Sequence, residues 1–334
     1  MPRRLLALIL GLSLLTGCGA RGDGRTPAHG DAGSGPSSGA SAGAVGAAEA
    51  AQAFELLQGL GDAWRDRDCA AVGRLTAWAE ETLGGRACEA TRNGRPAPAT
   101  AGTLGKYAEP EFLLPASADE DRWFVALARE PDPAYFLFVD EGDGWRLGAG
   151  PIPATGDTVP GTASDAASDA VPEAAASSGS TAAASGTGVR ARLVPQRYLT
   201  YLTDPAGVSG VTFPEGDAAA RLRADLGVRR TEAAPDRLTT DVRLVVGPRR
   251  VIPLRGGALV VHALEIEYRQ RPRPGRSSLS RPVHGGAELR AFTGRSRAAE
   301  LTGTEIVLLV TGVGDDGEVS TVASRRALAD LTAK

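Results

Sequence analysis

The sequence predicts an α+β fold in which helices precede an antiparallel sheet, and this order occurs twice. The first observation is a change of period, from helical spacing of apolar residues over 54–64 to alternation in twos over 122–129. The second is the return of the same order from residue 190 onwards. The third is a low-complexity run at 154–189 between the two blocks. Because each block has the size of one domain, we expect domains at 48–153 and 190–334.

The chain begins with a pattern typical of a secretory signal, with a charged start, a short apolar core and small residues at its end. The core, residues 5–15, is too short to span a bilayer as a mature helix. Residues 15–18, Leu-Thr-Gly-Cys, resemble a bacterial lipobox. The resemblance implies that residues 1–17 are removed and that Cys18 is acylated on its sulfur. The alternative is an ordinary secretory signal with an incidental thiol.

Two stretches contain almost no large apolar side chain, so nothing in them offsets the entropy of ordering. Residues 18–47 are therefore predicted to be a disordered tether. Residues 154–189, rich in Ala, Ser, Thr, Gly and Asp, are predicted to be a disordered linker.

The first block begins with a predicted amphipathic helix. Its apolar stripe consists of Phe54, Leu57, Leu60 and Trp64. A second helix is expected to begin near Cys69 and to end at Gly84-Gly85 at the latest, because glycine commonly ends helices. The stretch 91–110, punctuated by Pro and Gly, is expected to be a loop.

Besides Cys18, the chain has two cysteines, Cys69 and Cys88. We expect them to form a disulfide if the protein is exported, because that compartment is oxidising. Two small buried apolar residues are the alternative. Bridged cysteines need Cα atoms within about 7 Å. A bond would therefore require the second helix to end nearer Ala79 or Glu81.

The rest of the first block is predicted to be an antiparallel meander. Residues 122–129 alternate, and residues 135–139 are continuously apolar. Turn residues at 140–144 precede a partner strand that begins at Trp145.

The second block repeats the order of elements. Two short helices are expected at 196–202 and 215–226. Six strands are expected, at 238–246, 250–254, 258–269, 287–292, 305–311 and 318–323. Tight turns are predicted at Gly256-Gly257 and at Asp315-Asp316-Gly317.

Several phrases carry a family resemblance: WRDRDC at 64–69, the apolar strand 135–139, DGWRL at 143–147 and RGGALVVHALEIEY at 255–268. The element order and these phrases resemble the nuclear transport factor two-like superfamily, which includes SnoaL-like cyclases and ketosteroid isomerase. The whole chain resembles actinobacterial lipoproteins of unknown function with two such domains. The resemblance implies two cone-shaped domains, in each of which N-terminal helices cap a curved sheet and enclose a pocket.

The candidate pocket residues lie on the strand 258–269. One face of this strand is expected to line a pocket in the second block, with His262, Leu264, Ile266 and Tyr268. A neutral imidazole there can bind a ligand or accept a proton, and a hydrogen-bonded core histidine is the alternative. A second histidine, His284, is expected to face solvent in a loop. No catalytic residue is assigned, because the first block has no histidine and its acids lie at helix ends and turns.

The charge balance is near neutral, at −3, which gives no reason to expect a nucleic-acid partner. No metal site and no cofactor motif is found. Five arginines occur between 269 and 281. A basic patch for anionic lipid or wall polymer is one interpretation of them, and a solvated loop is the other.

Together these observations predict a lipid-anchored extracellular binding or accessory protein without catalytic activity, on the outer face of the cell membrane. The expected partners are the membrane, through the lipid on Cys18, and either another envelope protein or a small apolar ligand. One alternative is a SnoaL- or isomerase-type enzyme with an acid–base residue in the pocket of the second domain. A third is a module whose sheet faces dock another protein or each other.

Overall fold

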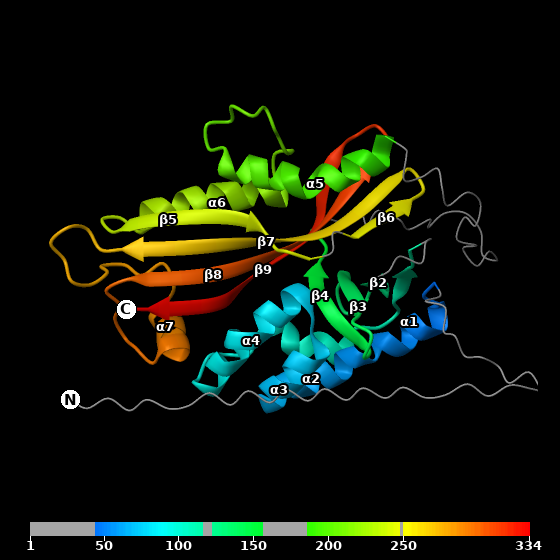
Figure 1. The fold of residues 1–334 in the computed structure, drawn as a ribbon, viewed down its shortest axis with the longest axis horizontal. Helices are drawn as coiled ribbons and strands as arrows, with labels where there is room; N and C mark the ends of the chain where they lie inside the picture. The colour runs from blue at the N-terminus through cyan, green and yellow to red at the C-terminus, as the bar shows by residue number, and fades with distance from the viewer. Residues whose placement is uncertain (1–43, 116–121, 156–185, 248–249) are drawn as a thin grey trace, which may run out of the picture. The chain divides into compact units, whose positions relative to one another are not determined.

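The computed structural model of the protein describes residues 44–115, 122–155, 186–247 and 250–334 (Figure 1). Within them the fold is α+β, with a four-stranded and a five-stranded antiparallel sheet and helices packed on both. We call residues 44–155 the N-terminal half and 186–334 the C-terminal half. The expectations for the signal segment, for Cys18, for tether residues up to 43 and for linker residues 156–185 lie outside the described residues.

The N-terminal half begins with four α-helices and a 3-10 helix. These are α1 (Ala47–Phe54), α2 (Leu56–Asp66), α3 (Cys69–Leu75), α4 (Trp78–Arg92) and η1 (Ala99–Lys106). The predicted stripe of Phe54, Leu57, Leu60 and Trp64 is buried, but it spans two helices that are separated by a turn at Glu55. The 3-10 helix occupies a stretch that was expected to be a loop, and it buries Ala101 and Leu104.

The helix that begins at Cys69 ends before Gly84-Gly85, within the predicted bound, but these two glycines do not themselves end a helix. The break comes earlier, after Leu75, where the Ala77 amide donates to the carbonyl of Leu147 on the sheet. The next helix, α4, then runs through both glycines to Arg92. Packing favours glycine at position 84, because a Cβ there would lie 2.8 Å from Cγ1 of Val72 on α3.

The predicted disulfide is confirmed, and the early helix break makes it possible. It turns α4 back along α3, so that Cys69 and Cys88 form a bond with their Cα atoms 5.6 Å apart. The helix that begins at Cys69 thus ends even before Ala79, as the bond requires.

The sheet of the N-terminal half has the order β1-β2-β3-β4. Its strands are β1 (Glu111–Leu113), β2 (Arg122–Ala128), β3 (Ala134–Asp140) and β4 (Trp145–Pro153). The last three agree with the predicted meander, whereas β1 lies just beyond the expected loop and was not foreseen. Nearly every residue of β2 and β3 is buried, which means that both faces of the sheet are covered.

The C-terminal half has three helices and five strands. The helices are α5 (Gly186–Thr203), α6 (Ala218–Glu232) and α7 (Gly286–Thr293), and the strands are β5 (Arg237–Leu244), β6 (Arg250–Leu254), β7 (Gly257–Arg271), β8 (Leu301–Gly314) and β9 (Val319–Ala333). The strand order is β5-β7-β8-β9, with β6 paired to the other part of β7. The helix α5 begins at Gly186, inside the range that was predicted to be linker.

One predicted strand of this half is a helix. Residues 287–292 alternate in twos, but they form most of α7, which buries Leu289 and Phe292 against α4 and the end of β9. Leu289 and Phe292 are three residues apart and therefore share one helical face. The helix ends at Gly294, whose φ is +70°.

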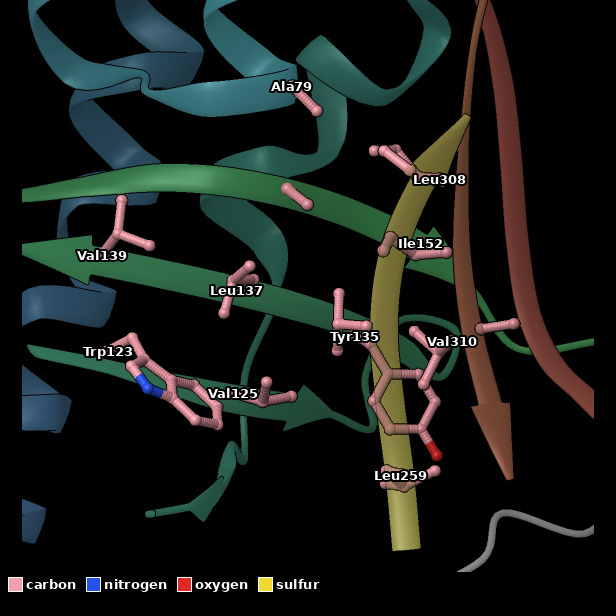
Figure 2. Packing of buried hydrophobic residues seen from close by; sticks show 14 of the residues in the cluster. Ala79, Trp123, Val125, Tyr135, Leu137, Val139, Ile152, Leu259, Leu308 and Val310 are labelled. Atoms are coloured by element: carbon pink, nitrogen blue, oxygen red, sulfur yellow. The ribbon is translucent and has the colours of Figure 1, made fainter. Parts of the chain in front are cut away.

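The two sheets face each other across a shared apolar core (Figure 2). Trp123, Val125 and Leu137 come from the N-terminal sheet, and Leu259, Leu308 and Val310 come from the C-terminal sheet. The other face of the N-terminal sheet packs on α1 and α2, and the other face of the C-terminal sheet packs on α5 and α6. Within the unit Ala42–Lys334 the layers are therefore helix, sheet, sheet and helix.

Candidate binding cavity

A cavity of about 530 Å³ lies where helices of the N-terminal half meet the C-terminal half. Its apolar wall comes from α2, α4 and η1 and includes Leu60, Trp64, Leu83 and Leu104. Its polar wall includes Glu80, Arg95, Arg229, His284, Glu288, Glu305, Arg325 and Arg326. The volume falls within the range of small-molecule sites, roughly 300–1,000 Å³.

The position of β9 at the edge of its sheet explains why so many charges meet there. Neighbouring residues of a strand point to opposite faces. Arg325 therefore contacts the N-terminal half, and Arg326 contacts α6. Because no further strand follows β9 in the sheet, both side chains border the same cavity.

Glu80 and Arg325 form an ion pair that joins the two halves. Glu80 also accepts a hydrogen bond from the Gly150 amide at 3.0 Å. Arg325 donates to the carbonyls of Gly150 and Pro151 at 2.8 and 3.3 Å. Burial raises the pKa of Glu80, while Arg325 and the Gly150 amide oppose that rise.

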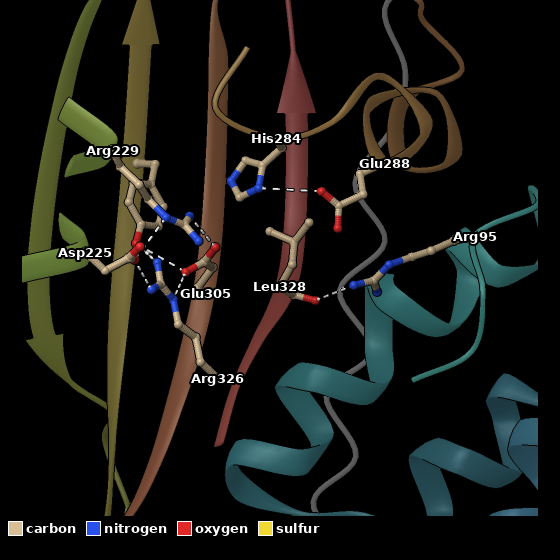
Figure 3. A network of polar contacts seen from close by, with 9 residues as sticks. Arg95, Asp225, Arg229, His284, Glu288, Glu305, Arg326 and Leu328 are labelled. Carbon is tan, nitrogen blue, oxygen red and sulfur yellow. Dashed lines mark hydrogen bonds and ion pairs between the residues drawn. The ribbon is translucent and has the colours of Figure 1, made fainter. Parts of the chain in front are cut away.

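A second polar cluster surrounds Glu305 (Figure 3). Its Oε1 accepts from Arg229 at 2.8 Å, and its Oε2 accepts from the hydroxyl of Tyr268 at 3.2 Å and from Arg326. Arg326 also pairs with Asp225 on α6. Two arginines thus balance two carboxylates, so the cluster carries no net charge. Burial and the neighbouring Glu305 raise the pKa of Tyr268, which keeps its hydroxyl protonated.

His284 lies in the cavity wall, and the expectation that it faces solvent is wrong. It is 4% exposed, and its Nδ1 lies 3.8 Å from Oε2 of Glu288 (Figure 3). Gly303 leaves the space that the ring fills, because a Cβ there would lie 2.4 Å from Nε2. Burial lowers the pKa of His284, so its imidazole is neutral at pH 7.

Arg95 was not singled out in the sequence, because it lies in the stretch expected to be a loop. Its guanidinium lies 4.9 Å from the centre of the Phe292 ring, and Nη2 donates weakly to the carbonyl of Leu328 at 3.4 Å. Among the described residues no carboxylate lies within 4 Å of it, in contrast to Arg229, Arg325 and Arg326. No local sequence pattern would have revealed this difference.

The four predicted pocket residues lie elsewhere. His262, Leu264, Ile266 and Tyr268 are buried on the face of β7 that packs on α5 and α6. The His262 ring lies 4.8 Å from that of Tyr198, and burial lowers its pKa from 6.5 to about 3. None of the four lines the cavity, although the Tyr268 hydroxyl reaches Glu305, which does.

Within the described ranges, no group of three or more His, Cys, Asp or Glu side chains is arranged to hold a metal ion. None of the described helices combines the length and the apolar character needed to cross a bilayer. No protein-family model matches the chain, and neither a curated protein nor a solved structure shows significant similarity to it.

Proposed function

We propose that the protein is a lipid-anchored, extracytoplasmic binding or accessory protein without catalytic activity, and that the cavity between its halves is its ligand site. The observation that carries the proposal is the cavity of about 530 Å³ to which both halves contribute walls. Its most buried carboxylates, Glu80 and Glu305, are already paired with arginines, an arrangement that favours binding over proton transfer.

The walls indicate an apolar ligand with one anionic group. Leu60, Trp64 and Leu104 offer an apolar surface on one side. On another side Arg95 presents a guanidinium that has no carboxylate within 4 Å among the described residues, although the more distant charge of Glu288 acts on it. Guanidinium groups bind carboxylates and phosphates through paired hydrogen bonds.

The proposed location rests on the lipobox-like residues 15–18. The 25 residues between Cys18 and the first described residue would span at most about 90 Å, which is ample reach from a membrane. Cys18→Ser tests the anchor: the wild-type protein should incorporate radiolabelled palmitate and partition into detergent, and the variant should do neither. A variant that still partitions into detergent would contradict lipid anchoring.

Native mass spectrometry of the mature protein, extracted in mild detergent, tests the cavity. We expect a co-purifying small molecule in the wild type. Thr100→Trp, which places a bulky side chain in the cavity wall, should abolish binding of this molecule. Gly102→Trp is the matched control, because Gly102 lies on the outside of η1 with nothing within 4 Å of its Cβ position. Retention of the ligand by Thr100→Trp would place the site elsewhere.

A second candidate function is acid–base catalysis, and the position of His284 favours it. A neutral imidazole 3.8 Å from a carboxylate can accept a proton from a bound molecule. Incubation of the co-purified molecule with the wild type and with His284→Gln distinguishes the two functions. Chemical change with the wild type alone would establish an enzyme, and an unchanged mass with both would support binding.

A further inference from the structure

The charges of the C-terminal half are strongly segregated. Residues 269–299 contain eight arginines and one glutamate, a net charge of +7 in a chain whose total is −3. All eight arginines are exposed. The other residues of the chain are therefore acidic overall, and the positive charge is concentrated at one place.

The fold gathers these arginines at one end of the C-terminal sheet. β7 ends and β8 begins side by side, with Gln270 paired to Leu301 (Figure 1). The chain between the two strands forms two loops around α7. These loops lie next to each other, because the amide of Leu279 donates to the carbonyl of Ala298 at 2.9 Å.

Most of the arginines lack an acidic partner. Arg269 pairs with Glu267 and Arg271 pairs with Glu300. The other six have no carboxylate within 4 Å among the described residues, and we call them the arginine face: Arg273, Arg276, Arg281, Arg290, Arg295 and Arg297. The nearby Asp236 accepts from the backbone amides of Ser280 and Arg281, so its charge holds the loop in place and pairs with no guanidinium.

The side-chain chemistry of this face suits phosphate groups at a surface. Guanidinium groups form paired hydrogen bonds with phosphate oxygens, and each basic residue near an anionic membrane contributes roughly 1 kcal/mol. The large apolar residues of these loops, Leu279 and Val283, are half-buried, so the face has nothing to insert into a bilayer. Single-stranded nucleic acid would call for exposed aromatic side chains, and the arginine face has none.

We propose that the arginine face docks the folded part of the protein on the anionic phospholipid headgroups of the membrane. The lipid anchor of the proposed function would bring the face to that membrane, but the contact itself depends only on charge.

Vesicle co-sedimentation tests this contact on the full mature chain carrying Cys18→Ser, which removes the anchor. We expect binding to vesicles with about 30% phosphatidylglycerol, no binding to pure phosphatidylcholine, and a steep loss as salt rises. The variant Arg273→Gln/Arg276→Gln/Arg295→Gln/Arg297→Gln should weaken binding about 1,000-fold, since four charges of about 1 kcal/mol each are removed. The matched control changes four exposed arginines of the N-terminal half, Arg65, Arg74, Arg92 and Arg129, to Gln and should retain most of the binding.

Three results would overturn the proposal: equal binding to neutral vesicles, an equal loss in the control variant, or a stronger affinity for soluble polyphosphate than for vesicles at equal phosphate concentration. The last result would make a phosphate polymer the partner. The arginine substitutions do not alter the cavity, and the assay does not depend on the lipid because Cys18→Ser removes it, so failure here leaves the proposed function standing.

Discussion

The two halves share an order of elements, yet different interactions hold their outer layers together. The core between the N-terminal sheet and its helices contains aromatic side chains and a disulfide. The rings of Phe124 and Phe138 are stacked with their centres 4.8 Å apart, and those of Phe54 and Phe136 meet edge-on with centres 5.7 Å apart. The corresponding layer of the C-terminal half contains buried polar groups. Apolar contacts do not titrate, whereas buried histidines and ion pairs do, so the comparison predicts different responses to pH and to mutation.

The polar groups of the C-terminal half are connected. The hydroxyl of Tyr198 accepts from Thr311 at 3.0 Å and shares a hydrogen bond with Thr321. Asp217 accepts from the Thr321 amide at 2.7 Å and caps α6 through the amide of Ala219. A helix cap and a strand are thus tied to one buried tyrosine. Such networks are costly to break because each member would be left without a partner.

The largest effect is expected for Glu305→Gln. The change removes the buried charge that faces Arg229 and Arg326, and breaking a buried pair typically costs 3–5 kcal/mol, so we expect a loss of about 4 kcal/mol. Urea unfolding at pH 7 measures it. Glu300→Gln, directly before the same strand, is the control, because its partners Arg271 and Lys334 are exposed and little change should follow. Equal effects would mean that burial does not distinguish the two carboxylates.

Reduction of the Cys69–Cys88 bond should weaken the N-terminal half by about 3 kcal/mol, the chain-entropy value for a loop of about 20 residues. The measurement is the urea midpoint of the oxidised and the reduced protein. Cys69→Ala/Cys88→Ala should match the reduced form and should not respond to reductant. If reduction leaves the midpoint unchanged, the ring contacts alone hold this layer.

A pH-dependent loss of stability is expected from His262. Its folded pKa of about 3 lies below the ordinary 6.5, so the unfolded chain takes up the proton first as the pH falls. The contribution of neutral His262 to the free energy of unfolding is fully present above pH 6.5 and is lost as the pH falls towards 3. Between pH 7.5 and 4.5 the loss should be about 2–3 kcal/mol. Urea unfolding at both pH values should show a much smaller difference in His262→Leu. An unchanged difference would assign the acid sensitivity to other groups.

The order of elements was predictable from the sequence because periodicity reports which residues are buried. The structure of residues 287–292 and the role of Gly84 were not predictable in this way. Residues 287–292 alternate in twos, and only contact with α4 and β9 selects the helix. Gly84 favours a helix end by propensity, but the close approach of Val72 makes it a packing residue. In both cases tertiary contacts override a short pattern.

The cavity was even less accessible to sequence reasoning. Glu80 and Arg325 are separated by 245 residues, and they meet only because the edge strand β9 lies against α4. His262 carried the clearer local signal, because it is a histidine on the apolar face of a predicted strand. In the structure that face packs into the core beneath α5. A pattern on one strand shows that a face is buried, and it does not show whether the neighbouring layer leaves a space.

The smallest expected effect tests how tightly the N-terminal layer is packed. Gly84 and Gly85 are neighbours within α4, and alanine at either position should gain about 1 kcal/mol of helix propensity. At Gly85, where a Cβ meets nothing within 4 Å, that gain should appear as increased stability. At Gly84 the Cβ would lie 2.8 Å from Val72, a stiff and fully buried side chain, and overpacking costs about 1–3 kcal/mol.

Gly84→Ala should therefore destabilise the protein by about 1 kcal/mol, and Gly85→Ala should stabilise it, as measured by urea unfolding. A double-mutant cycle with Val72→Ala identifies the contact, because removing the valine methyl groups should make Gly84→Ala neutral or stabilising. If Gly84→Ala is stabilising in the wild-type background, α3 and α4 separate at little cost. The disulfide would then be the main constraint on their approach, and the covalent bond would account for more of the difference between the two halves than the packing does.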